Sequence, residues 1–436
     1  MARVRSVVAK VAACACGLAV GVAMVAGCSG SRDSAGGSGG PRGGSSASVP
    51  AAGTTADDAV VAATDALLAE RERAITTADT AAHAALVADP ASAAGAALLQ
   101  QFSVLSALPW ERLAHDRPRV VESAPTASAG SRALEVTTRW RLAGERADSR
   151  EQERVVVTQV DGAWRLVEVS GTATAVAPWW GEGAAISRAA HGVVIGSVDA
   201  GTREQLARDV DRAHALAAAA WPVPTVPPLT VIAPRTAAEY ATVSGGTESG
   251  HSQVAAVTDG PTDAQGRAVA DRVIISPDAW QRLSAEGRAF VLAHEAVHVV
   301  IRSDVPGQAP LWLSEGYADW VAYAPTGLPA EEIAAQALDE VRAGRMPSGL
   351  PTQGDYNAAA AAIGPSYQRS WVLVSMLVDE FGAARVCEFI RAATVSGSQA
   401  DAEAAADRAF GTVLGTSRDA VVTRWQSRLA QLAGTA

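Results

Sequence analysis

The chain has 436 residues, of which 48% are hydrophobic and 19% are charged, and its formal net charge is −10. This length and apolar content are sufficient for two domains that each bury a core. The acidic balance argues against nucleic acid as a partner and provides no cluster of basic residues for anionic lipid.

The N-terminal residues 1–27 have the pattern of a secretory signal. Three basic residues within the first ten precede an apolar run over 11–25 that is short for a membrane span. The run ends in Val-Ala-Gly-Cys at 25–28, which resembles a bacterial lipobox and implies cleavage before Cys28 and a lipid on its sulfur. An uncleaved anchor is the alternative. Both interpretations place the protein at the cell membrane, on its extracytoplasmic face.

Loss of residues 1–27, which carry three positive charges and no acids, changes the net charge from −10 to −13. Attachment to the membrane would then depend on the lipid alone. Residues 28–54 are rich in Gly, Ser, Ala and Pro, and we expect a lipid-attached flexible linker there. Cys387 would be the one cysteine left without a lipid, so the mature chain would contain no internal disulfide.

Residues 55–177 are predicted to form a first domain, with two long helices before an antiparallel sheet. Asp161-Gly162 is a hairpin signal between its last two strands. Helices followed by a curved sheet are similar to the cone-shaped α+β fold of nuclear-transport-factor-like domains, and we expect a spacer or binding module. His115 and Asp116 are interpreted as part of a surface turn. The predicted helices are 60–76 and 93–105, the chain is extended over 110–120, and the strands are 132–142, 153–159 and 163–170.

The segment 177–183 marks a domain boundary, and residues 185–436 are predicted to form a second domain. It begins with strands and helices that alternate, which predicts a mixed sheet. We expect the strand at 253–257 to be either an edge strand or an ordinary internal one. His251, in a Gly-rich loop, is interpreted as a surface residue rather than a metal ligand. The predicted strands are 192–198, 229–233, 253–258 and 272–276, and the helices are 202–221 and 236–243.

From residue 328 onward the pattern is helical, which predicts a helical C-terminal subdomain. Between the first two of these helices, the Gly/Pro-interrupted stretch 344–363 could flank a cleft. The predicted helices are 331–343, 366–381, 383–393 and 417–432.

The most informative motif is His294-Glu295-Ala296-Val297-His298, within an apolar helix that Ser284 is placed to cap. Residues four apart on a helix project from the same face, so His294 and His298 can bind one zinc ion. Glu295 lies beside that face, where its carboxylate can reach a water on the metal.

A second motif, Trp312-Leu313-Ser314-Glu315-Gly316-Tyr317-Ala318-Asp319-Trp320, supplies further carboxylates. A catalytic zinc site has three protein ligands and an open position. Glu315 follows His298 at a sequence separation that is usual for a carboxylate as the third ligand. Asp319 lies one turn beyond Glu315, where it can accept the other ring N–H of a ligating histidine.

Together these two motifs resemble the gluzincin metallopeptidases, the thermolysin-like clan, and in particular bacterial families with a Leu-Ser-Glu-Gly signature. The resemblance implies that His294, His298 and Glu315 bind zinc and that Glu295 is the general base. It also implies an oxyanion donor, since negative charge develops on the attacked carbonyl. Thermolysin-like enzymes use a downstream histidine, but this chain has no histidine after His298.

Other gluzincins use a tyrosine on a later helix, and Tyr367, after a Gly-Pro break, is our candidate in preference to Tyr317, Tyr323 and Tyr356. Local packing of Tyr367 is the alternative.

The sequence therefore predicts an α+β protein with a nuclear-transport-factor-like domain before a zincin-type metallopeptidase domain. It would be a lipid-anchored zinc metallopeptidase that acts on peptide or protein substrates, with no nucleic-acid partner. The alternative is a surface binding or scaffolding lipoprotein whose zinc site is not catalytic.

Overall fold

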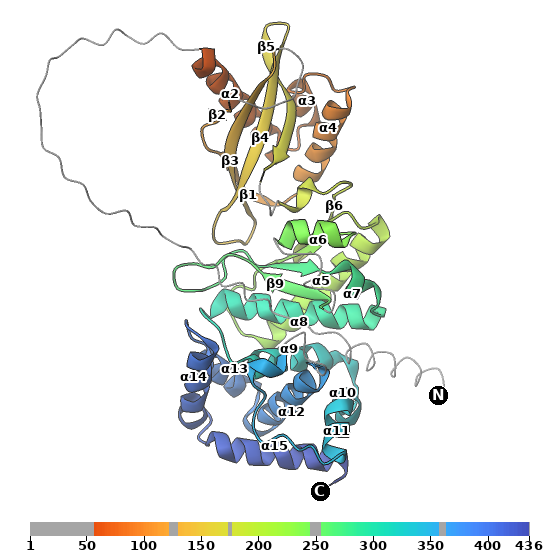
Figure 1. The fold of residues 1–436 in the computed structure, drawn as a ribbon, viewed down its shortest axis with the longest axis vertical. Coiled ribbons are helices and arrows are strands. Elements are labelled where there is room, and N and C mark those ends of the chain that lie inside the picture. The colour runs from red at the N-terminus through yellow and green to blue at the C-terminus, as the bar shows by residue number, and fades with distance from the viewer. Residues whose placement is uncertain (1–55, 122–129, 173–176, 245–253, 357–362, 436) are drawn as a thin grey trace, which may run out of the picture.

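A computed structural model describes residues 56–121, 130–172, 177–244, 254–356 and 363–435. The chain is α+β, with a curled antiparallel sheet, then a mixed sheet, then a helical C-terminal part. Figure 1 shows these three parts stacked along the longest axis, with helix α8 (Ala285–Asp304) between the mixed sheet and the C-terminal helices. Every helix of the described residues is too short or too polar to cross a membrane. The predictions for Cys28, the linker and His251 lie outside the described residues.

The first part packs three helices against an antiparallel sheet of order β1-β3-β4-β5, in which β2 also pairs with β3. The predicted hairpin at Asp161-Gly162 is confirmed, since both residues have positive φ (51° and 80°) between β4 and β5. Apolar side chains of the helices and of alternate strand positions form one core. The elements are α2 (Ala56–Thr76), α3 (Thr80–Ala85), α4 (Ala93–Leu105), β1 (Trp110–His115), β2 (Arg119–Val120), β3 (Arg132–Leu142), β4 (Ser149–Val160) and β5 (Ala163–Gly171).

The expected surface turn at His115 and Asp116 is wrong. His115 is the last residue of β1, and its Nδ1 lies 2.6 Å from Glu72 Oε1 on α2. The Asp116 amide donates to the Thr137 carbonyl at 2.8 Å, and its carboxylate pairs with Arg139. The β1–β3 pairing extends to the end of this segment because helix α2 and strand β3 supply partners for its polar groups.

The mixed sheet has the order β6-β7-β8-β10-β9, and β7, β8 and β10 are parallel while the two edge strands are antiparallel to their neighbours. Edge strand β6 was not predicted. The strand expected at 253–258 is β9, which is an edge strand of this sheet; Gln253 lies outside the described residues. The elements are β6 (Ala185–Ala189), β7 (Gly192–Gly196), α5 (Ala200–Ala220), β8 (Leu229–Ala233), α6 (Ala237–Ser244), β9 (Ala256–Asp259), β10 (Arg272–Ile275) and α7 (Pro277–Gln281).

Both faces of the mixed sheet are buried, against different neighbours. On β7, Val194 belongs to the core shared with α5, α8 and the C-terminal helices, while Val193 and Ile195 belong to a core shared with the first part. The boundary segment contributes to the second core through Trp179 of η1 (Pro178–Trp180), whose ring centroid lies 4.8 Å from that of Trp140. The first part therefore packs directly on the sheet that precedes α8.

The C-terminal part is helical, as predicted, and contains α14, which was not predicted. Helix α12 begins at Ile363, so the Gly364-Pro365 pair lies in its first turn instead of before it. Gly316 of α9 lies against α12 so closely that a Cβ there would be 2.5 Å from the Ser370 carbonyl oxygen. The elements are α9 (Leu311–Tyr323), η2 (Ala324–Thr326), α10 (Ala330–Ile333), α11 (Ala335–Arg342), η3 (Gln353–Tyr356), α12 (Ile363–Phe381), α13 (Ala383–Ala393), α14 (Gln399–Thr412) and α15 (Arg418–Ala433).

Candidate metal centre

Helix α8 carries the first motif. Ser284 is its N-cap and accepts a hydrogen bond from the Gly287 amide at 3.1 Å, as expected from sequence. His294 and His298 lie one turn apart and face α9, while Glu295 faces β9. All three side chains are buried, with at most 3% of each residue exposed.

Three donor groups converge between α8 and α9. The Nε2 atoms of His294 and His298 lie 3.0 Å apart, and Glu315 Oε2 lies 3.2 Å from His294 Nε2. Glu315 Oε1 lies 3.6 Å from His298 Nε2. Four tetrahedral ligands about 2.1 Å from an ion lie about 3.4 Å from one another, so these donors are spaced for a common ion. This group, in which one atom of each residue lies within 4.8 Å of the others, could hold a metal ion.

Two side chains outside the donor set lie against the Nδ1 atoms of the two histidines. His294 Nδ1 lies 2.8 Å from Asp319 Oδ1, so with an ion bound the ring would donate from Nδ1 and leave the lone pair of Nε2 for the ion. On the other histidine, Ser314 Oγ lies 3.5 Å from His298 Nδ1. The one-turn spacing between Glu315 and Asp319 thus places the Glu315 carboxylate beside the Nε2 atoms of the two histidines. It places the Asp319 carboxylate beside Nδ1 of His294.

Burial and charge pairing act together on the pKa values here. Burial opposes ionisation of Glu315, but the two histidines outweigh it and lower the pKa of this carboxyl to about 2. Burial would also lower the pKa of His294, yet its hydrogen bonds to Asp319 and Glu315 raise that pKa well above 6.5. The site therefore favours an ionised Glu315 carboxylate, which is the form that binds a cation.

Among the described residues, one carboxylate oxygen of Glu295 has a hydrogen-bond partner and the other has none. Thr258 Oγ1 on β9 donates to its Oε2 at 2.7 Å, while the buried Oε1 has no hydrogen-bond partner there. Burial raises the pKa of Glu295, and both histidines and Thr258 oppose that increase. An unpartnered carboxylate oxygen beside three metal donors is what a water on the ion would satisfy, so the residues fit a bound metal.

Sequence reasoning did not identify Thr258 as a site residue. Its strand was expected, but no local signal indicates which residue of β9 faces Glu295, because that contact depends on how the sheet packs on α8. A cavity of about 40 Å³ also adjoins the donors, and its lining includes His298, Ser314, Glu315, Val305 and Ile390.

Tyr367 lies near the metal donors but forms no hydrogen bond with them among the described residues. It is buried on α12, and its ring centroid lies 5.3 Å from that of Tyr356. Burial and the carboxylates of Glu315 and Asp319 raise its pKa well above 10, so those charges lie within electrostatic reach.

The other tyrosines are engaged elsewhere. The Tyr317 hydroxyl donates to the Ala220 carbonyl at 2.7 Å, and the Tyr356 hydroxyl contacts Ser370 Oγ. The Tyr323 ring packs on Phe290 with centroids 4.4 Å apart.

Comparison of the chain with protein-family models, with curated proteins and with solved structures found no match. The functional assignment therefore depends on the chemistry of these residues.

Proposed function

We propose that this protein is an extracytoplasmic zinc metallopeptidase of the gluzincin type, anchored to the cell membrane by a lipid on Cys28. The observation that carries the proposal is the convergence of His294, His298 and Glu315 beside a buried Glu295 whose Oε1 has no partner among the described residues. Three protein ligands leave a fourth position of a tetrahedral ion open, and open positions are typical of catalytic zinc.

Zinc in this site would polarise a peptide carbonyl and lower the pKa of an attacking water to about 7. Glu295 would accept a proton from the attacking water at Oε1 and would later pass it to the leaving amine. Thr258 holds Oε2, so the carboxylate keeps one orientation during both transfers. Asp319 holds the His294 ring, and Tyr367 donates a hydrogen bond to the developing oxyanion.

The fold is consistent with this proposal. Helices before a curled antiparallel sheet support a nuclear-transport-factor-like first domain, over 55–177. A mixed sheet whose antiparallel edge strand contacts the metal helix supports a zincin-type domain over 185–436. The edge of β9 is the place where an extended peptide would pair with the sheet.

The test compares the whole mature protein with its Glu295→Gln variant. We expect one zinc per chain in both, measured by mass spectrometry of the metal. A peptide library should be cleaved by the wild type only, with cleavage abolished by a chelator and restored by zinc. General base catalysis contributes about 10²–10⁴-fold, so the variant should lose at least that much.

Equal cleavage by both forms would remove Glu295 from the mechanism. A wild type that binds zinc and a protein partner but cleaves nothing would favour the scaffolding alternative.

The anchor has its own test. Cys28→Ala should leave the precursor unprocessed or release the protein from the membrane fraction, detected by mass and by fractionation. Unchanged mass and unchanged membrane retention would contradict the lipid.

A further inference from the structure

The loop between β3 and β4 of the first domain reaches the end of the helix that carries the metal donors. The Arg146 guanidinium donates to the carbonyl of Ser303, the next-to-last residue of α8, and lies 3.4 Å from the Ala268 carbonyl. The Arg146 amide also donates to the Val269 carbonyl at 2.7 Å. The last carbonyls of a helix have no partner within it, and a cation there is favourable. Arg146 thus caps α8 from another domain.

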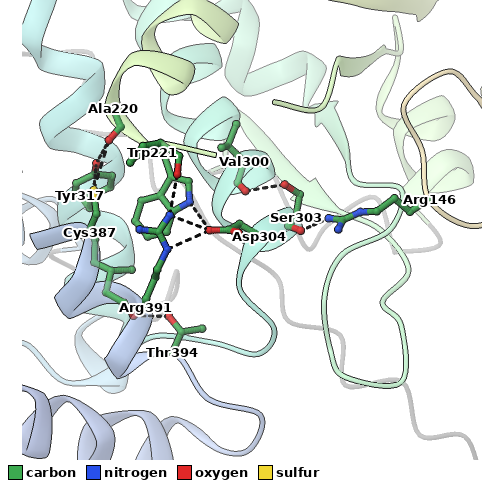
Figure 2. Close-up of polar contacts among 12 residues, drawn as sticks. Arg146, Ala220, Trp221, Val300, Ser303, Asp304, Tyr317, Cys387, Arg391 and Thr394 are labelled. Atoms are coloured by element: carbon green, nitrogen blue, oxygen red, sulfur yellow. Dashed lines mark hydrogen bonds and ion pairs between the residues drawn. The ribbon is translucent and has the colours of Figure 1, made fainter. Parts of the chain in front are cut away.

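Figure 2 shows this convergence at the C-terminal end of α8. Arg146 approaches Ser303 from one side, while Asp304 contacts Arg391 of α13 and Trp221 on the other. The end of the metal helix is therefore held between the first domain and the C-terminal helices.

The same loop also holds the strands that face Glu295. Glu145 forms a largely buried ion pair with Arg272 at 2.8 Å, and the Arg272 guanidinium stacks over Trp140 with 4.6 Å to the ring centroid. Arg272 is the first residue of β10 and pairs with Asp259 of β9. The next residue of β9 toward its N-terminus is Thr258, which donates to Glu295.

The segment that leads into β10 also contacts α8 at this end. Arg302 of α8 forms two hydrogen bonds with Asp271, at 2.7 and 3.0 Å, and the Ala268 amide donates to the Arg302 carbonyl at 2.9 Å. The first domain therefore contacts both elements between which Glu295 is held, α8 through Arg146 and the β9–β10 pair through Glu145.

We propose that Glu145 and Arg146 are positioning residues of the metal centre, through which docking of the first domain sets the alignment of α8 against β9. The metal-affinity part of this proposal needs only the His294, His298 and Glu315 group, while its catalytic part rests on the proposed peptidase function. It assigns to the first domain a role in the site itself.

The test uses Glu145→Gln and Arg146→Gln in the whole mature protein, with Arg188→Gln as the matched control. Arg188 also bridges the two domains, donating to the Ala107 carbonyl at 2.9 Å, but from β6 at the opposite edge of the mixed sheet from β9. Zn²⁺ affinity is measured by competition with a chromogenic chelator. Coupling between sites is typically about 5–150-fold, and we expect a loss of about 5- to 10-fold for each loop variant and none for the control.

Conservative variants separate positioning from general damage. Arg146→Lys keeps a cation at the helix end and should restore Zn²⁺ affinity. If Glu145→Gln fails to fold, Ser149→Ala removes one neutral contact of Arg272, at 3.1 Å, and should lower Zn²⁺ affinity in the same direction. Loop variants should also lower kcat with little change in KM.

Unchanged Zn²⁺ affinity in the folded loop variants, or an equal loss in Arg188→Gln, would overturn the proposal while leaving the peptidase function intact. If the loop variants lower Zn²⁺ affinity but the wild type cleaves no peptide, the positioning role is supported and the proposed peptidase function is contradicted.

Discussion

Two clusters of buried ionisable groups, one in the first domain and one at the metal centre, differ in what they can bind. Inside the first domain, Arg71 donates to Gln101 at 2.7 Å, and Thr138 donates to Glu153 at 2.8 Å. At the metal centre, one possible ligand atom from each of His294, His298 and Glu315 lies within 4.8 Å of the others. Arg71 places a positive charge close to Glu153 and Glu72, and a guanidinium repels a metal ion, so the first cluster is not suited to bind one.

Burial of charge alone therefore does not define a metal site. Burial lowers the pKa of Arg71, while the negative charges of Glu153 and Glu72 oppose that change. At the metal centre, by contrast, the converging groups are a carboxylate and two imidazoles, and each can bind a cation in its deprotonated form.

The first prediction concerns the charge balance inside the first domain. Arg71→Met removes the buried positive charge that favours ionised Glu153, and an uncompensated buried charge costs about 3–5 kcal/mol of folding free energy. Denaturant unfolding measures the loss, and Arg73→Met is the control, because its exposed pair with Glu70 contributes at most about 1 kcal/mol. The double variant with Glu153→Gln should recover most of the loss. Equal unfolding midpoints for Arg71→Met and the control would show that the charge of Arg71 does not stabilise Glu153.

The second prediction concerns the oxyanion donor. Tyr367→Phe should lower kcat by about 10²–10³-fold and leave bound zinc unchanged, since removal of one such donor typically has that effect. The Tyr317→Phe variant is the control, because that hydroxyl contacts the Ala220 carbonyl and not the centre. Peptide hydrolysis under saturating substrate measures both. Full activity in Tyr367→Phe would indicate that this tyrosine only packs.

The third prediction concerns the carboxylate behind His294. Asp319→Asn weakens the hydrogen bond that orients the ring, and loss of such a partner typically lowers metal affinity about 10–100-fold. Chelator competition measures the change. Asp339→Asn, on an exposed pair with Arg342, should have no effect. If both variants bind zinc as the wild type does, Asp319 does not support the site.

These two clusters also differ in how far sequence could predict them. Helical spacing alone places His294 and His298 on one face, and the same spacing relates Glu315 to Asp319. The first-domain cluster has no such signal, because Glu151 and Glu153 alternate with polar neighbours on β4 and would ordinarily be assigned to solvent. The Glu151 carboxylate accepts a hydrogen bond from the Ala177 amide at 2.9 Å, and the charge of Arg71 on α2 acts on Glu153, so the environment of both depends on segments distant in sequence.

Two missed elements have different causes. Strand β6, Ala185–Ala189, contains a single large apolar residue and depends on pairing with β7. Helix α14 did have a local signal, the capping box of Ser398 and Asp401, but its buried face is mostly alanine. The capping box could have predicted helix α14 from the local sequence, whereas strand β6 can be recognised only from its pairing with β7.

The smallest effect should come from His83, a buried residue of the first domain with no charged partner. Its ring stacks on Phe102 with centroids 4.4 Å apart, and neither ring nitrogen has a hydrogen-bond partner among the described residues. Burial, aided by the positive charge of Arg71, lowers the pKa of His83 from 6.5 to about 4. Between these two values the unfolded chain binds a proton that the folded chain does not, so stability is lost as the pH falls through this window.

The free energy of unfolding should fall by about 1–2 kcal/mol between pH 7.5 and pH 5. Near the top of this window the fall should be less than about 1 kcal/mol for each pH unit. His83→Phe keeps the stacking and cannot titrate, so its unfolding free energy should fall less over the same range. Denaturant unfolding at the two pH values measures both proteins. Zinc binding by the centre at pH 7.5 should be the same in both, because His83 contacts the first-domain core and not α8 or α9. An identical acid dependence in wild type and variant would show that His83 titrates normally in the folded chain, and the first-domain cluster would then be more open to water than its burial indicates.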